Sequence, residues 1–209
     1  PEDGPARLVV TSQGWYEFRH NTAQVERAAD GVLLFGCQDG VLLVDGETIT
    51  KVAADHPYAR IGNQAGNADS PIVLGDYKTD KDAELERPRQ FSLVDTRGAG
   101  AIRVVPIDTT YSFRSLARGP QGEAILLGAD GALHVFDAES GERTAHYPVI
   151  GAWTEPDDWQ QAMPVLHVQG STAYVADPAT RTVIAVDLTD GHRLSATEPG
   201  AEYFELTGS

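Results

Sequence analysis

A weak internal repeat constrains the fold of this 209-residue chain more than any other feature of its sequence. The clearest copy spans residues 171–194, where two apolar runs, 173–176 and 183–186, flank the turn-forming sequence DPAT. Asp187 ends the second run, and the sequence TDG forms the next turn. No helical spacing of apolar residues occurs in this stretch, so the pattern predicts three antiparallel strands in a meander.

Earlier copies of the same pattern occupy residues 31–52, 71–105 and 123–147. Each copy has a strand that ends in a marker aspartate, and the four markers recur at intervals of 50, 42 and 50 residues: Asp45, Asp95, Asp137 and Asp187. A charged insertion at 79–89 lengthens the first hairpin of the second copy, and we expect it to be a solvated, mobile loop. Copies of about 40–50 residues with four short strands each are typical of propeller blades.

We therefore predict an all-β fold of β-propeller blades, each a four-stranded antiparallel meander, with about four blades in a single domain over 1–209. The predicted blades are 21–53, 58–107, 111–150 and 162–198, and strands within 6–18 would complete another blade. Small residues suit the crowded channel, so the innermost strands are predicted at 60–63, 112–117 and 165–168. Because the N-terminal strands have no inner partners of their own, we expect the chain to be part of a larger propeller. The missing blades would come from another segment or another chain.

Composition limits the possible partners. The chain has 31 acidic and 16 basic residues, and this net charge of −15 argues against nucleic acid and anionic membranes. No apolar run approaches the roughly 20 residues of a membrane span. No acid–base group typical of a propeller lactonase or hydrolase stands out, so we predict that the protein is not an enzyme. The single cysteine, Cys37, is predicted to be a packed core thiol.

The loops that lead into the innermost strands line the mouth of a propeller channel, so polar side chains there define the expected binding site. Histidines and carboxylates in these loops are compatible with a zinc site of nitrogen and oxygen ligands. The predicted metal ligands are His20, His56, Asp108 and Glu202. The alternative for each of them is a solvated loop residue, because no HExxH or CxxC spacing supports the site.

The remaining polar residues are interpreted as structural or solvated. We expect three histidines to be exposed and not to bind metal: His134, His146 and His192. Arg118 on an innermost strand could meet an anion, or it could pair with a marker aspartate between blades. The loop between Trp153 and Trp159 is expected to pack over a blade.

Three parts of the sequence resemble the AztD family of periplasmic zinc metallochaperones. They are FGCQDGV at 35–41, YSFRSLARGP at 111–120 followed by DGALHV at 130–135, and WTEP at 153–156 leading to AYVADP at 173–178. The similarity covers nearly the whole chain and about the C-terminal half of the family's length. The last blade also resembles the more general YVTN-type repeats.

The resemblance implies a seven-bladed propeller in the periplasm, or a secreted one, that takes part in zinc transport. Family members hand Zn²⁺ to the solute-binding protein of an ABC importer, and His20 falls where the family has a histidine before the FGC segment. Two hypotheses follow for this chain. It is a zinc-delivering metallochaperone, or it is a non-catalytic protein-interaction propeller that has lost metal binding, because a histidine that the family has near Glu202 is absent.

Overall fold

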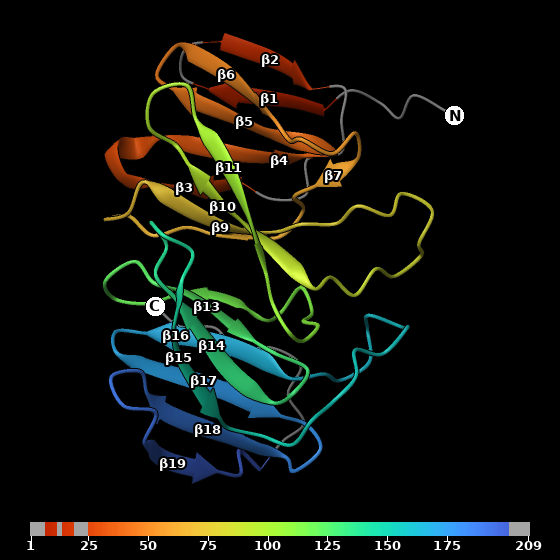
Figure 1. The fold of residues 1–209 in the computed structure, drawn as a ribbon, viewed down its shortest axis with the longest axis vertical. Coiled ribbons are helices and arrows are strands. Elements are labelled where there is room, and N and C mark those ends of the chain that lie inside the picture. Colours follow the sequence, from red (N-terminus) through yellow and green to blue (C-terminus); the bar gives the residue numbers. More distant parts are fainter. Residues whose placement is uncertain (1–6, 12–13, 19–24, 201–209) are drawn as a thin grey trace.

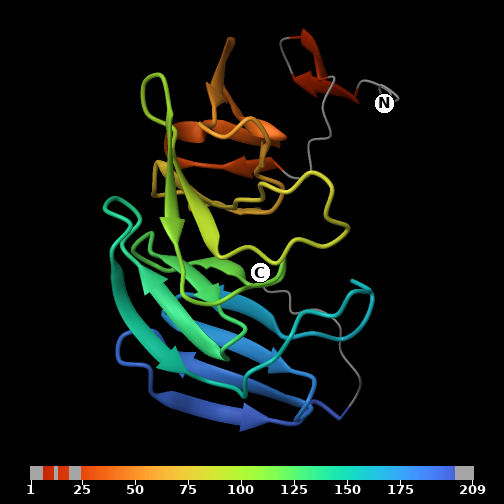
Figure 2. The same cartoon turned by 45° about the vertical axis from the view of Figure 1, so that its right-hand side comes forward.

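Four antiparallel sheets follow one another in chain order in the computed structural model, which describes residues 7–11, 14–18 and 25–200 (Figure 1). Within each sheet, strands that are neighbours along the chain are hydrogen-bonded neighbours in space, except that the short strand β7 (Ala59–Arg60) joins the first sheet by a parallel pairing. A separate hairpin pairs β1 (Arg7–Thr11) with β2 (Gly14–Phe18), and Figure 2 shows it apart from the four sheets. In these described residues, no helix is long and apolar enough to cross a membrane.

The first sheet contains β3 (Val25–Arg27), β4 (Leu33–Cys37), β5 (Asp39–Asp45) and β6 (Thr48–Ala53), and a short 3-10 helix, η1 (Ala29–Gly31), precedes β4. The second contains β8 (Gln64–Ala65), β9 (Ile72–Asp76), β10 (Gln90–Asp95) and β11 (Ala101–Pro106). The third contains β12 (Leu116–Arg118), β13 (Ala124–Leu127), β14 (Ala132–Phe136) and β15 (Arg143–Pro148). The fourth contains β16 (Val165–Gln169), β17 (Thr172–Asp177), β18 (Thr182–Asp187) and β19 (Arg193–Thr197).

The period-2 pattern of the strands explains how the sheets pack. Successive side chains of a strand point to opposite faces, so a strand with apolar residues at every position contributes to two cores. On β9, Val73 joins the core between the first and second sheets, whereas its neighbour Leu74 joins the core between the second and third. On β13, Leu126 packs against the second sheet and Leu127 against the fourth. Three apolar layers therefore hold the four sheets together.

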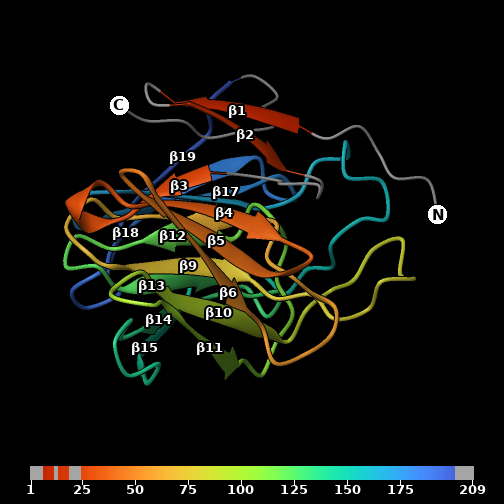
Figure 3. The same cartoon turned by 90° about the horizontal axis from the view of Figure 1, so that it is seen from above.

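The first strands of the sheets gather on one side of the molecule. The strands β3, β8, β12 and β16 contact one another in this order. In Figure 3, β11 and β15, the last strands of the second and third sheets, lie on the side opposite β3 and β12. This radial order of strands is the arrangement of propeller blades, and the predicted all-β fold of four-stranded meanders as part of a larger propeller is confirmed.

The marker aspartates fold the turn between the third and fourth strands. Asp137 Oδ1 accepts hydrogen bonds from the backbone N–H of Ser140 at 2.7 Å and from its hydroxyl at 2.8 Å. Asp187 holds the N–H of Thr189 in the same way at 2.8 Å. These capping hydrogen bonds satisfy turn N–H groups that have no strand partner, which explains why aspartate recurs at this position of the repeat.

Two predicted innermost strands begin later than expected. Residues 60–63 do not form the first strand of the second sheet, because β7 (Ala59–Arg60) pairs with β5 of the preceding sheet and Ile61 N–H donates to Cys37 O at 3.0 Å. The predicted strand 112–117 starts with a turn, in which Ser115 N–H donates to Ser112 O at 3.1 Å, and β12 follows. The third, at 165–168, lies within β16 and is confirmed.

The close contact between β4 and the segment after β7 makes Gly36 a sensitive position. A Cβ atom on Gly36 would lie 1.7 Å from Ile61 O, whereas a Cβ atom on Gly151 would meet nothing within 4 Å. We expect Gly36→Ala to destabilise the fold by about 1–3 kcal/mol, the usual cost of overpacking. In thermal unfolding, Gly36→Ala should lower Tm by roughly 5 °C, while Gly151→Ala leaves Tm within about 1 °C. Equal Tm values for the two variants would contradict this packing.

Candidate metal site

One group of potential metal ligands stands on the third sheet. Asp130 lies in the turn between β13 and β14, His134 on β14 and His146 on β15 (Figure 1). His134 and His146 are direct partners in the β14–β15 register, so their side chains share one face of the sheet. Their ring centroids are 4.8 Å apart. Asp130 reaches the same face from the end of the strand, four residues before His134.

The three side chains converge through their polar atoms. His134 Nε2 lies 3.1 Å from Asp130 Oδ1 and 3.0 Å from Oδ2, and His146 Nε2 lies 3.6 Å from Oδ2. One ligand atom from each residue lies within 4.8 Å of the other two. Tetrahedral zinc with ligand bonds of about 2.0–2.2 Å requires ligand atoms roughly 3.3 Å apart. The two separations that involve Asp130 are already close to this value.

The turn that carries Asp130 is held from two neighbouring segments. Asp130 N–H donates to Thr109 Oγ1 at 3.2 Å, which ties the turn to the loop after β11. Trp153 donates its indole N–H to Gly128 O and its backbone N–H to Ala129 O, both at 2.8 Å. These contacts bring the carboxylate to His134, and they confirm that the Trp153 end of its loop packs over a blade.

Burial and hydrogen bonds set the protonation states of His134 and Asp130. Only 1% of the His134 side chain is exposed, and this burial lowers the pKa of His134, with the charge and hydrogen bond of Asp130 opposing the shift only in part. For Asp130, burial by itself raises the pKa, but the hydrogen bonds from His134 and from the N–H of Ala132 leave the pKa below its ordinary value. A neutral histidine beside an ionised carboxylate is the state that a metal ion requires of both ligands.

This lowered pKa predicts a loss of stability in mild acid. The folded-state pKa of His134 lies below that of an unfolded histidine, so its contribution is complete above the unfolded pKa of about 6.5 and is lost as the pH falls through the folded pKa. We expect the free energy of unfolding of metal-free protein to fall between pH 7.5 and 5.0, with a slope from this group of at most about 1.4 kcal/mol per pH unit. His134→Gln should flatten the slope, and the exposed-turn control His192→Gln should not. Parallel pH profiles of the free energy of unfolding for wild type and His134→Gln would contradict this role of His134.

A cation also contacts the site from the side away from Asp130. Arg143 Nη1 lies 3.5 Å from His134 Nδ1 and 3.4 Å from Asp108 Oδ2. The Arg143 side chain is 43% exposed and that of Asp108 is 88% exposed. Asp108, His134 and Arg143 thus form a chain of contacts that ends in solvent.

The four residues predicted from the sequence to bind metal do not form one cluster among the described residues. His20 and Glu202 lie outside the described residues. His56 is exposed, and its Nδ1 lies 2.6 Å from Tyr58 O within the same loop. Asp130, His134 and His146 are called the Asp130 group below. Asp108 contacts Arg143, which contacts His134, but Asp108 is not a member of this group. The ligand set predicted from the sequence therefore stays a prediction.

The expectation that three histidines are exposed is confirmed for His146 and His192 and is wrong for His134. The missed signal lies in the hairpin. His134 and His146 each lie six residues from Ser140 in the turn. A regular continuation of the Phe136–Arg143 pair would place His134 opposite Ala145, and a register shift between Val135 and Phe136 makes the two histidines partners. An aspartate four residues before the first histidine completes the pattern.

Arg118 hydrogen-bonds to backbone carbonyls and a serine hydroxyl and not to a marker aspartate, so the interpretation of an ion pair between blades is wrong. It is buried, and it donates hydrogen bonds to the carbonyls of Ile72 and Gly122, to Glu123 O at 3.1 Å and to Ser70 Oγ at 3.1 Å. Burial lowers the pKa of Arg118 to about 10. Arg118 therefore ties the second sheet to the third through backbone carbonyls. Cys37 is buried, as predicted, and burial raises the pKa of its thiol.

The charged insertion is held at its end. Glu86 accepts the N–H groups of Thr79 at 2.9 Å and Asp80 at 2.8 Å. Arg87 donates to Glu155 O at 2.6 Å and pairs with Asp157 at 2.7 Å. Figure 2 shows the two loops, 77–89 and 150–163, projecting on the same side of the stack. Residues 80–84 of the insertion are exposed, as expected for a solvated loop, while Arg87 docks its end on the neighbouring loop.

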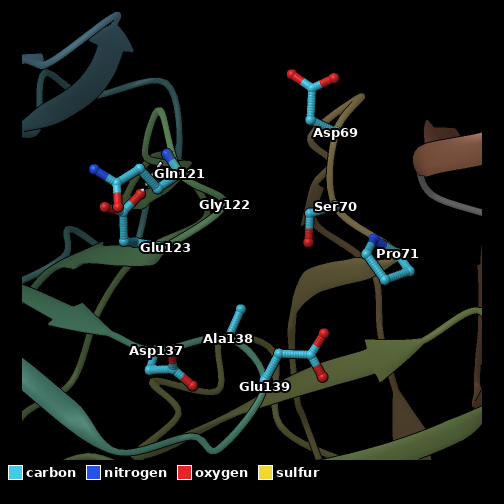
Figure 4. Close-up of a pocket in the computed structure, with 9 residues that line it drawn as sticks. All are labelled: Asp69, Ser70, Pro71, Gln121, Gly122, Glu123, Asp137, Ala138 and Glu139. Atoms are coloured by element: carbon cyan, nitrogen blue, oxygen red, sulfur yellow. Dashed lines mark hydrogen bonds between the residues drawn. The ribbon is translucent and has the colours of Figure 1, made fainter.

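A pocket of about 240 Å³ lies at the other ends of the strands, between the second and third sheets (Figure 4). Four carboxylates line it: Asp69, Glu123, Asp137 and Glu139. Most of them already hold neighbouring groups, since Glu123 accepts Gln121 N–H at 2.9 Å and Glu139 pairs with Arg97 at 2.8 Å. This acidic pocket contains no histidine, so it offers a poorer donor set for zinc than the Asp130 group.

No protein-family model matches the sequence, and no curated protein matches it. Solved structures do match. Apo AztD from Citrobacter koseri superposes with a TM-score of 0.68 at 19% identity over 81% of this chain and 46% of AztD. A second structure of Citrobacter koseri AztD gives a TM-score of 0.69 at 20% identity, with 82% and 46% covered.

This chain has the propeller fold of AztD. The predicted resemblance is thereby confirmed at the level of the fold, and the chain spans about half the length of AztD. A chain of the mitotic checkpoint complex also matches, with a TM-score of 0.59 at 18% identity over 87% of this chain and 53% of that one. The coverage of AztD agrees with a chain that holds part of a larger propeller.

Proposed function

We propose that this chain is a zinc-binding propeller that takes up Zn²⁺ at Asp130, His134 and His146 and passes it to a partner protein. The observation that carries the proposal is the convergence of two imidazole nitrogens and one carboxylate on one face of the third sheet. Two histidines and one carboxylate suit zinc, since thiolates would favour Cu⁺ and oxygen ligands alone would favour Mg²⁺ or Ca²⁺. The AztD-like fold supports the same metal, because zinc is what the sequence resemblance implies.

The exposure of the ligands suits a site that releases its metal. The side chains of Asp130 and His146 are 39% and 45% exposed, whereas His134 is buried. Three protein ligands leave a fourth position for water or for a ligand from a partner. We propose that the partner is the zinc solute-binding protein of an ABC importer and that the exchange takes place in the periplasm. In this role the protein acts as a carrier and not as an enzyme.

Zinc transfer between purified proteins tests the proposal. Chelator-stripped protein is titrated with Zn²⁺ against a chromophoric chelator, and the zinc-loaded protein is then mixed with a metal-free solute-binding protein. Direct transfer should continue in the presence of excess chelator that traps free Zn²⁺. Binding weaker than about micromolar would contradict the zinc site, and transfer that stops when the trap is added would contradict delivery by contact.

A second candidate is a non-catalytic interaction propeller without metal. Exposed aromatic side chains in two loops that connect successive blades favour it, since Phe113 is 36% exposed and Trp159 63% exposed. Such a propeller would bind its protein partner equally well with and without Zn²⁺. If Trp159→Ala removed partner binding and the Asp130 group bound no zinc, this candidate would replace the first.

The ligands predicted from the sequence form a separate proposal. We propose that His20, His56, Asp108 and Glu202 could supply a channel-mouth zinc site, distinct from the Asp130 group. Zinc stoichiometry separates the two sites. A second equivalent of bound Zn²⁺ that disappears in His20→Ala and persists in His146→Ala would support the channel-mouth site.

A further inference from the structure

Arg143 lies where a zinc-binding histidine needs a hydrogen-bond acceptor. Its Nη1 is 3.5 Å from His134 Nδ1, and the arginine guanidinium can only donate hydrogen bonds. His134 Nδ1 is therefore the acceptor in this contact. On the other side of the ring, Nε2 faces both oxygens of Asp130, which are acceptors, so Nε2 carries the proton. Both neighbours select the same tautomer of His134.

Zinc binding at Nε2 reverses these roles. The metal binds the lone pair of Nε2, so the single proton of the neutral imidazole moves from Nε2 to Nδ1. In most zinc sites this second N–H donates to a carboxylate or a carbonyl, which fixes the ring and strengthens the ligand. Here it would face the N–H groups of Arg143, so two donors would oppose each other. The positive charge of Arg143 also repels the ion.

Asp108 offers Arg143 another position. Its Oδ2 is already 3.4 Å from Arg143 Nη1, and its side chain is 88% exposed, so the guanidinium can move onto it without displacing packed groups. Bidentate arginine–carboxylate pairs are stronger than the single contacts seen in this structure.

We propose that Arg143 is a gate for zinc: it contacts His134 in the metal-free protein and moves onto Asp108 when Zn²⁺ binds. Through its contact with His134, Arg143 stabilises the metal-free tautomer and weakens zinc binding, which favours release to a partner. The gate rests on the proposed zinc site at Asp130, His134 and His146. Arg143 is a positioning residue and does not bind the metal.

A double-mutant cycle tests the gate by competition titration with Zn²⁺ and a chromophoric chelator. Arg143→Gln removes the charge and supplies an amide oxygen that can accept the Nδ1 proton. We expect it to tighten zinc binding about tenfold, the Coulomb effect of one charge near a divalent ion in a solvated site. Arg103→Gln, on the exposed face of β11, makes the same change in net charge and should leave the affinity within about twofold.

Asp108→Asn removes the alternative position of Arg143. We expect it to weaken zinc binding several-fold in the wild-type background and to have no effect in the Arg143→Gln background. Equal weakening in both backgrounds would overturn the gate, because Asp108 would then act as a ligand or through its charge alone. Unchanged affinity in Arg143→Gln would overturn the gate and leave the zinc site intact. Failure of the wild type to bind Zn²⁺ would instead refute the proposed function.

A second measurement needs no metal. The ¹⁵N chemical shifts of His134 in metal-free protein should show Nε2 protonated and Nδ1 unprotonated. Arg143→Gln should shift this balance toward the Nδ1–H form, since the amide oxygen can accept that proton. A wild-type His134 protonated on Nδ1 would overturn the proposal independently of any zinc titration.

Discussion

Replacing His134 with glutamine should weaken zinc binding by at least about 100-fold. Even residues that only support a metal ligand typically contribute 10–100-fold to metal affinity, and His134 is itself a proposed ligand. It is also the buried member of the group, with 1% of its side chain exposed, so its ring is held in place by packing before the metal arrives. The measurement is a competition titration of chelator-stripped protein with Zn²⁺.

The matched control is His192→Gln, which changes an exposed histidine in the turn between β18 and β19. This variant should bind zinc as the wild type does. Denaturant unfolding of both variants shows whether the fold is retained, and His134→Gln at neutral pH should remain folded because glutamine keeps a polar group between Asp130 and Arg143. A folded His134→Gln variant with zinc affinity within about threefold of the wild type would refute the site.

Replacing Phe91 with alanine should cost about 3–5 kcal/mol of the free energy of unfolding, the usual effect of truncating a fully buried phenylalanine. Phe91 on β10 is 0% exposed, and its ring meets Phe136 of β14 edge to face with centroids 4.8 Å apart. This pair joins the second and third sheets beside the Asp130 group, since Phe136 and His134 lie on the same face of β14.

Urea denaturation measures this effect, with Phe113→Ala as the control. Phe113 is 36% exposed and contacts Arg114 across its ring, so its loss should cost less than about 1 kcal/mol. A cost below about 1 kcal/mol for Phe91→Ala would mean that the sheets do not form one cooperative stack. Equal costs for the two phenylalanines would lead to the same conclusion.

The fold could be predicted from the sequence because each repeat has turn chemistry at a fixed place. Three of the four marker aspartates, Asp95, Asp137 and Asp187, accept a backbone N–H of the turn that follows them, and the apolar runs become strands buried on both faces. The first strands were harder to locate. β8 has only two residues. The segment before it, residues 59–61, donates backbone hydrogen bonds to the preceding sheet, and local strand propensity does not reveal such a contact.

The site was harder to predict than the fold because it depends on strand register. His134 and His146 do not form a metal-binding motif in the sequence, and only the pairing of β14 with β15 makes them neighbours. The sequence predicts Asp108 as a ligand from its place in a loop. In the structure Asp108 contacts Arg143, which in turn contacts His134, and no sequence pattern indicates this arginine. The two histidines become partners only through the register shift between Val135 and Phe136, so regular pairing of the predicted hairpin does not bring them together, and it does not reveal the arginine either.

Anomalous diffraction at the zinc edge from crystals of the zinc-loaded protein tests the central claim most directly. The proposed function predicts a strong peak about 2.0–2.2 Å from Nε2 of His134, Nε2 of His146 and one carboxylate oxygen of Asp130. Arg143 should then contact Asp108 and no longer contact His134. A zinc peak only elsewhere, or none at the Asp130 group in crystals that contain stoichiometric zinc, would contradict the account.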